Sequence, residues 1–159
     1  MNNNRIALAI PAQAVCNTIL QRAFVEKIPV SPMKLQKLLY FTYQTYLKRT
    51  GQLLFSERFE AWPYGPVLPS IYDEFKSFHG DPITMFAKNA DGSVSVISGT
   101  ASGACGIVYS IAETWEKYKN KTGIELSGIT HQKESAWYKA VKRKDSLLDI
   151  DDIREENIA

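Results

Sequence analysis

Cysteine, histidine and excess charge are all scarce in this chain of 159 residues. It has two cysteines, Cys16 and Cys105, and a formal net charge of +2 at neutral pH. Two cysteines cannot build the disulfide framework of small secreted proteins, so we expect two reduced thiols buried in the core of a cytoplasmic protein. The near balance of charge gives no support to binding of nucleic acid or of an anionic membrane.

Long hydrophobic runs are also missing. The segment from Met1 to Arg5 leads into a short apolar stretch that Pro11 interrupts, and no clear cleavage signal follows. A secretion signal needs a cleavable apolar segment, and a membrane helix needs about 20 apolar residues. The sequence therefore predicts neither a signal peptide nor a membrane span.

Catalytic and metal-binding patterns are weak. Neither His79 nor His131 has a second histidine or a cysteine at the spacing of metal ligands. The glycine-rich segment 99–106 lacks the lysine and the glycine spacing of a phosphate-binding loop. We predict no catalytic residue, metal or cofactor. An enzyme is the minor alternative, and it would need a pocket with convergent polar groups, for which His131, Glu134 and Tyr40 are the candidates.

The hydrophobic pattern, with 45% hydrophobic residues, predicts one compact domain over residues 1–159. The fold class is α+β and predominantly α-helical, with a small antiparallel sheet of two or three strands. Apolar residues at helical spacing predict helices from near Pro11 to before Pro29, from Pro32 to before Gly51, up to Gly80, and over about 102–121, 126–132 and 136–143.

The helix after Ser31 carries the clearest local signals. Ser31 is the predicted N-cap and Pro32 the first helical residue, while Gly51 ends the helix. Residues 33–41 are apolar around more than one face, with Lys34 and Lys37 on the remainder. This pattern predicts a central helix with neighbours on several sides.

Three other boundaries are less fixed by the sequence. Pro69 allows the third helix to begin near Pro66 with one lost hydrogen bond, or at Pro69 itself. Residues 58–62 alternate as a strand, and their predicted partner is a second strand at 93–98, after the Asp91-Gly92 turn. The acidic segment 149–159 is either a last short helix or a solvated tail.

The segment Trp62-Pro63-Tyr64-Gly65-Pro66 is strongly constrained. Each proline fixes its own φ near −65° and favours an extended conformation in the residue before it. The segment therefore holds two large aromatic side chains at defined angles, each with one polar group that needs a partner when buried. Both a corner of the core and a docking surface would explain this arrangement.

A series of short motifs in a fixed order surrounds this segment. They read KLQKLLYF at 34–41, EAWPYGPV at 60–67 and YDEF at 72–75, followed by LS at 126–127, TH at 130–131 and SAW at 135–137. The series resembles the Panacea domain, an antitoxin-like family also described as phage-associated proteins, over about residues 14–142. Ala136 stands where the family usually has proline.

The resemblance implies a structural signature and a role for its histidine. The signature residues in this chain are Leu35, Leu38, Leu39, Tyr40, His131 and Trp137. A functional role for His131 is one interpretation. We favour a structural histidine, hydrogen-bonded at a helix end and helping to seat Trp137.

The resemblance also implies a function. It predicts an antitoxin of a type II toxin–antitoxin system, which neutralises a cognate protein toxin by direct binding and is not an enzyme. The alternative is a prophage-associated protein that acts as a proteolytic adaptor, delivering its partner to a cellular protease, or as another interaction module. We predict that the partner-binding surface consists of Trp62, Tyr64, Gly65, Pro66, Ile71, Tyr72 and Phe75.

Overall fold

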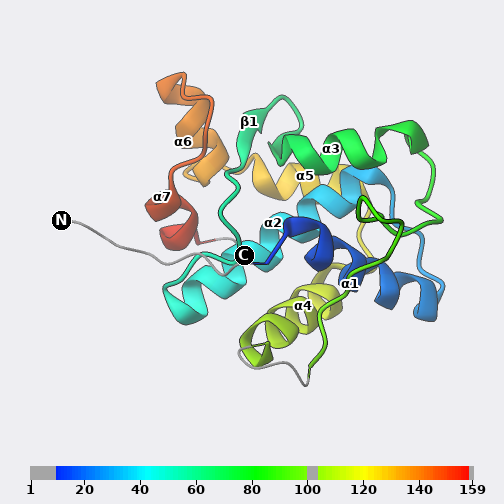
Figure 1. Cartoon of the computed structure of the whole chain (residues 1–159). Helices are drawn as coiled ribbons and strands as arrows, with labels where there is room; N and C mark the ends of the chain where they lie inside the picture. Colours follow the sequence, from blue (N-terminus) through cyan, green and yellow to red (C-terminus); the bar gives the residue numbers. More distant parts are fainter. Residues whose placement is uncertain (1–9, 100–103, 158–159) are drawn as a thin grey trace.

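A computed structural model describes residues 10–99 and 104–157, and helix α2 (Pro32–Thr50) lies at its centre. This helix contacts α1, α3, α4, α5, α7 and strand β2, and Figure 1 shows those elements arranged around it. The Ser31 side chain accepts a hydrogen bond from Lys34 N at 3.2 Å, Pro32 is the first helical residue, and Gly51 closes the helix with φ +72°. The predicted bounds and the central position of this helix are confirmed.

Helix α2 is buried around nearly its whole circumference. The signature residues Leu35, Leu38, Leu39 and Tyr40 are each at most 1% exposed. Lys34 and Lys37, which occupy the remaining face of this helix, are buried as well. Neighbouring elements on every side leave no solvent-facing stripe for the two lysines.

Helices α1 (Ala12–Glu26) and α4 (Cys105–Tyr118) pack on α2 and on each other. Pro11 immediately precedes the first helix, as predicted, whereas the predicted start of the other at Ser102 lies outside the described residues. Cys16 is buried in the core, but Cys105 is exposed at the first position of α4. The prediction of two buried cysteines is therefore wrong for Cys105.

The predicted sheet is present, but its strand pairing differs from the prediction. Strand β1 (Glu60–Trp62) pairs antiparallel with β2 (Gly65–Val67), only two residues further along the chain. Residues 93–98 are not a strand, because their backbone is bound by side chains of α1. Asn17 donates to Ser95 O at 3.0 Å, and Thr18 Oγ1 accepts from Ile97 N at 2.8 Å.

The other edge of β1 is covered by the segment 146–148. Ala61 N donates to Ser146 O at 2.8 Å, and Leu148 N donates to Phe59 O at 2.9 Å. After β2, α3 (Pro69–Phe75) begins at Pro69, which decides between the two predicted starts, and the 3₁₀ helix η1 (Lys76–Phe78) follows it.

The C-terminal third forms α5 (Gly123–Thr130), α6 (Ala136–Arg143) and α7 (Ile150–Glu155). Ser135 caps α6, accepting from Tyr138 N at 3.0 Å, so the helix begins at Ala136 without the proline that is usual in the family. The acidic tail is a helix capped by Asp149. No helix among residues 10–99 and 104–157 is long and apolar enough to cross a membrane.

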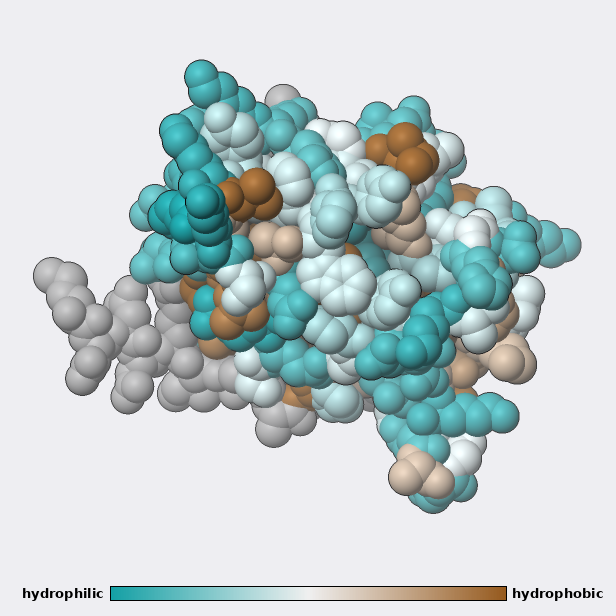
Figure 2. Space-filling model, turned by 90° about the horizontal axis from the view of Figure 1, so that it is seen from above, coloured by the Kyte–Doolittle hydropathy of each residue, from teal (hydrophilic) through white to brown (hydrophobic). Residues whose placement is uncertain are grey.

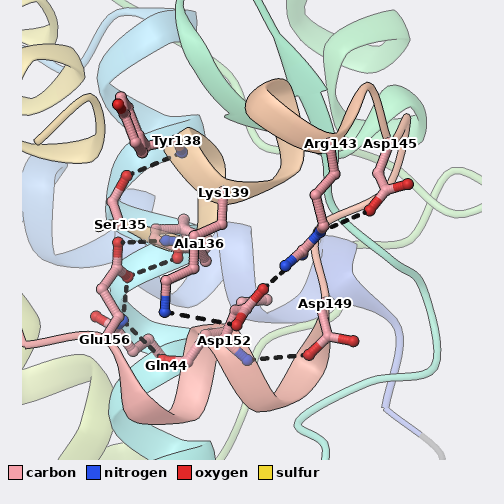
Figure 3. A network of polar contacts seen from close by, with 12 residues as sticks. Gln44, Ser135, Ala136, Tyr138, Lys139, Arg143, Asp145, Asp149, Asp152 and Glu156 are labelled. Carbon is pink, nitrogen blue, oxygen red and sulfur yellow. Dashed lines mark hydrogen bonds and ion pairs between the residues drawn. The ribbon is translucent and has the colours of Figure 1, made fainter. Parts of the chain in front are cut away.

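Figure 3 shows how α7 is joined to α6 and α2 by polar contacts. Glu156, buried just after α7, accepts from Ala136 N at 3.1 Å and from the Tyr40 hydroxyl at 2.7 Å. Its second carboxylate oxygen also accepts from Gln44 Nε2. One side chain therefore joins the C-terminal helix, the start of α6 and the central helix.

Candidate functional site

Strands β1 and β2 form a tight hairpin whose loop is Pro63-Tyr64. Trp62 pairs with Gly65 at the loop end of the ladder. Gly65 has φ +109°, and a Cβ atom there would lie 2.5 Å from Thr130 Oγ1 and 2.9 Å from Lys37 Cε. Only glycine fits this position, because it tolerates the positive φ and leaves room for the threonine and lysine beneath the hairpin.

The main-chain oxygens of the hairpin are held by side chains from three helices and one helix end. Trp62 O accepts from Trp137 Nε1 at 2.7 Å, and Pro63 O lies 2.8 Å from His131 Nε2. Trp137 lies on α6, and His131 is the C-cap residue of α5. These two contacts fix the first half of the turn.

The second half of the hairpin is held in the same way. Tyr64 O accepts from Ser127 Oγ at 2.7 Å, and Pro66 O accepts from Lys37 Nζ at 3.0 Å. Gln36 then pairs with both the N–H and the C=O of Leu68, each at 3.0 Å. We call Lys37, Ser127, His131 and Trp137 the hairpin anchors, because each binds a carbonyl oxygen of residues 62–66.

The anchors explain most of the sequence motifs in structural terms. Lys37 belongs to KLQKLLYF, whereas Ser127, His131 and Trp137 belong to the LS, TH and SAW motifs. The motifs therefore converge on the backbone of the WPYGP segment, although they are far apart in the sequence. Sequence analysis missed the role of Lys37 and Ser127, because their shared target becomes visible only when the helices pack.

His131 makes the contacts that the structural interpretation expects of it. Its Nδ1 lies 2.5 Å from Ser127 O at the end of α5, and the centroids of the His131 and Trp137 rings are 3.8 Å apart. Both ring nitrogens thus face backbone carbonyl oxygens.

The three residues considered for a catalytic pocket lie in different environments. Tyr40 is fully buried and donates to Glu156, and burial followed by the nearby Glu156 charge raises the pKa of its hydroxyl. Both nitrogens of His131 face the hairpin and α5, and Glu134 is exposed with φ +70°. Their contacts do not form a shared reacting centre.

While the hairpin backbone is held from below, its aromatic side chains face outward. Tyr64 is 63% exposed and Tyr72 on α3 is 43% exposed. Trp62 is half-buried, with its ring 4.9 Å from that of Tyr72 and its indole N–H bonded to Glu60 at 2.7 Å. We call Trp62, Tyr64 and Tyr72 the aromatic patch.

Figure 2 views the molecule from the side of the hairpin and α3, which lie at the top of Figure 1. The middle of this face is white to pale teal, the colours of intermediate hydropathy, and both teal hydrophilic groups and a few brown hydrophobic groups lie around it. Aromatic side chains with one polar group each have this intermediate character and are favoured in protein interfaces.

The structure divides the predicted partner-binding residues into two groups. Trp62, Tyr64 and Tyr72 reach the surface, whereas Gly65, Pro66, Ile71 and Phe75 are buried. The buried residues support the patch from within, since Gly65 and Pro66 are part of the anchored hairpin and Ile71 and Phe75 fix α3 to the core. The surface available for contact is therefore smaller than the predicted set.

A groove of about 200 Å³ lies beside the aromatic patch. The N-terminal turn of α2, the hairpin and α3 form its sides. Its lining residues are mostly apolar or aromatic, and they include Met33, Val67, Ile71 and the three residues of the patch, with Lys37 and His79 as the basic groups.

Lys37 is the least expected residue of this groove. Its side chain is 1% exposed, and burial lowers the pKa of its ammonium group to about 8. Among the described residues no carboxylate forms a salt bridge with it, and the hydrogen bond to Pro66 O is its polar contact. Its position in the central helix, where every face is covered, is the signal that could have predicted burial.

Comparisons with known proteins place these features in context. The sequence model of the family described as "Antitoxin SocA-like, Panacea domain" matches residues 35–138. Antitoxin SocA of Caulobacter vibrioides (strain NA1000 / CB15N) is 42% identical over 69 residues, which are 43% of this chain and 37% of that protein. The aligned part is thus well under two thirds of the relative's length. No solved structure matches the chain.

Proposed function

Because the chain belongs to the antitoxin SocA-like, Panacea domain family, we propose that it is an antitoxin that neutralises a cognate protein toxin by direct binding, in a type II toxin–antitoxin system. Two observations support this proposal. The family and the similar protein carry the antitoxin description, and the most distinctive part of the molecule is an anchored hairpin that presents aromatic side chains to solvent.

The aromatic patch is the proposed centre of the toxin-binding surface. Binding energy in protein interfaces is concentrated in a few residues, among which tryptophan and tyrosine are enriched. Rigid presentation favours affinity, because less conformational freedom is lost on binding. The hairpin anchors supply that rigidity through contacts of 2.7–3.0 Å to the backbone.

The first experiment is growth of the host when the gene beside this one in the native operon is induced with and without this protein. We expect the neighbouring product to arrest growth alone and the pair to grow and co-purify. Trp62→Ala and Tyr64→Ala should each weaken the complex by about tenfold or more, the effect of losing a central interface residue.

Tyr109→Ala is the matched control. Tyr109 lies on α4 and is 61% exposed, close to the 63% of Tyr64, but it is not part of the groove or the patch. Full affinity of folded Trp62→Ala and Tyr64→Ala proteins would reject the aromatic patch as the binding centre. A harmless neighbouring protein would reject the antitoxin role in that operon. If the amount of the neighbouring protein falls when this protein is present, and no complex of the two is found, the adaptor alternative is favoured.

A further inference from the structure

Lys37 places an uncompensated positive charge beneath the aromatic patch. Removing an ammonium group from water is costly unless an opposite charge and hydrogen-bond acceptors replace the lost hydration. The lining of the groove contains no aspartate or glutamate within the part of the chain that the structure describes. The nearest acidic side chain of the hairpin, Glu60, already binds the indole N–H of Trp62.

The hydrogen bonds of Lys37 are also incomplete. A lysine ammonium group has three N–H donors. Pro66 O accepts one of them at 3.0 Å, and no second acceptor for Lys37 is found among the described residues. Two donors are therefore without an acceptor among the described residues, and Lys37 lines the groove through which an outside acceptor would reach them.

The groove above Lys37 has the character of a site for an amphipathic side chain. Trp62, Tyr64 and Tyr72 offer apolar ring surface, and the volume of about 200 Å³ exceeds that of a few water molecules, each of which takes roughly 30 Å³. Lys37 is the one lysine or arginine that lines the groove among the described residues, and its single charge matches a carboxylate better than the double charge of a phosphate.

We propose that this groove receives an aspartate or glutamate side chain of the partner protein, whose carboxylate binds Lys37 Nζ while its methylene groups contact the rings of the aromatic patch. The inference builds on the proposed toxin-binding role and specifies what the patch recognises. An acidic side chain supplies both the counter-charge and the missing acceptors of Lys37.

The test uses two blocked tripeptides as probes, one with glutamate between two leucines and one with glutamine there. Each is titrated into the full chain and followed through the NMR signal of the Trp62 indole N–H. The glutamate peptide should bind about tenfold or more tightly than the glutamine peptide, as expected for a hydrogen bond to a charged group. Lys37→Met should abolish this preference.

Lys34→Met is the matched control, because Lys34 is a second buried lysine one turn earlier in α2 and binds Lys119 O instead of the hairpin. It should keep the preference for glutamate. The proposal is overturned if the unmodified protein binds both peptides equally or neither, or if Lys37→Met keeps the preference. The first comparison needs no variant, so it decides the matter even if Lys37→Met does not fold.

A trileucine peptide with a free C-terminal carboxylate tests the other source of the same chemistry. Tighter binding of that peptide than of the blocked glutamate peptide would overturn the choice of an acidic side chain. These probes require no toxin, so the two proposals can fail separately. If this protein does not relieve toxicity but still prefers the glutamate peptide, the antitoxin role is rejected and the acidic-side-chain site in the groove is retained. Normal neutralisation without any peptide preference would reject the groove alone.

Discussion

Gly65 leaves no room for a side chain between the hairpin and the helices beneath it. We expect Gly65→Ala to reduce the free energy of unfolding by about 2–4 kcal/mol, because the new Cβ would lie 2.5 Å from Thr130 Oγ1 and the residue has φ +109°. Urea denaturation measures the loss. Gly92→Ala is the control, since Gly92 has φ +85° and open space around it, so equal losses would show that the close approach has no effect.

Lys37 should give the protein a distinctive stability at alkaline pH. Burial lowers its pKa from 10.5 to about 8, so the folded protein releases this proton before the unfolded chain does. The contribution that neutral Lys37 makes to the free energy of unfolding is complete above pH 10.5. It is lost as the pH falls through 8, because the lysine is then charged in the folded protein as well. Relative to Lys37→Met, the free energy of unfolding should therefore rise by roughly 3 kcal/mol between these pH values. Parallel denaturation profiles for the two proteins would contradict this expectation.

At the scale of elements, Glu156 determines how firmly α7 is attached. Glu156→Ala leaves the Tyr40 hydroxyl and Ala136 N without their acceptor in a buried place and removes one of the two acceptors of Gln44 Nε2, so we expect a loss of about 2–4 kcal/mol in thermal or urea unfolding. Glu155→Ala removes an exposed neighbour and should change stability by less than about 0.5 kcal/mol. Similar effects of the two substitutions would show that the network in Figure 3 contributes little.

The elements that the sequence predicted well have their signals within a few residues. Ser31-Pro32, Pro69 and Ser135 each mark a helix start through local capping or a fixed φ, and the structure begins helices at these positions. The predicted partner of β1, residues 93–98, was wrong because the pairing of a strand depends on which of several segments, some distant in the sequence, packs beside it. Asn17 and Thr18, more than 70 residues away from 93–98, bind the backbone that a strand would have used.

The candidate site was predictable to the extent that it depends on local rigidity. The two prolines and the aromatic residues of 62–66 indicated a rigid presenting segment, and Trp62 and Tyr64 do reach the surface. The burial of Ile71 and Phe75, and the position of Lys37 beneath the hairpin, depend on how α2, α3 and α5 pack. Such contacts are set by the whole fold, so a single sequence does not specify them.

At the scale of the whole molecule, the two cysteines offer a probe of global unfolding. Cys105 is exposed and Cys16 is fully buried in the core, where burial also raises the pKa of its thiol. We expect one thiol to react quickly with a chromogenic disulfide reagent in the native protein and the second to react only at the rate of global opening. Cys105→Ser should remove the fast phase alone. Rapid reaction of both thiols would contradict the packing of α1.

The hairpin anchors all bind main-chain oxygens, which are present whatever side chain a residue carries. Positions 62 and 64 can therefore exchange their side chains while the backbone stays bound to Trp137, His131 and Ser127. Under the proposed partner-binding role, the side chains that would contact a partner are thus separate from the contacts that hold the hairpin. A lineage could acquire a new binding specificity at the hairpin by single substitutions, without first acquiring compensating changes in the core.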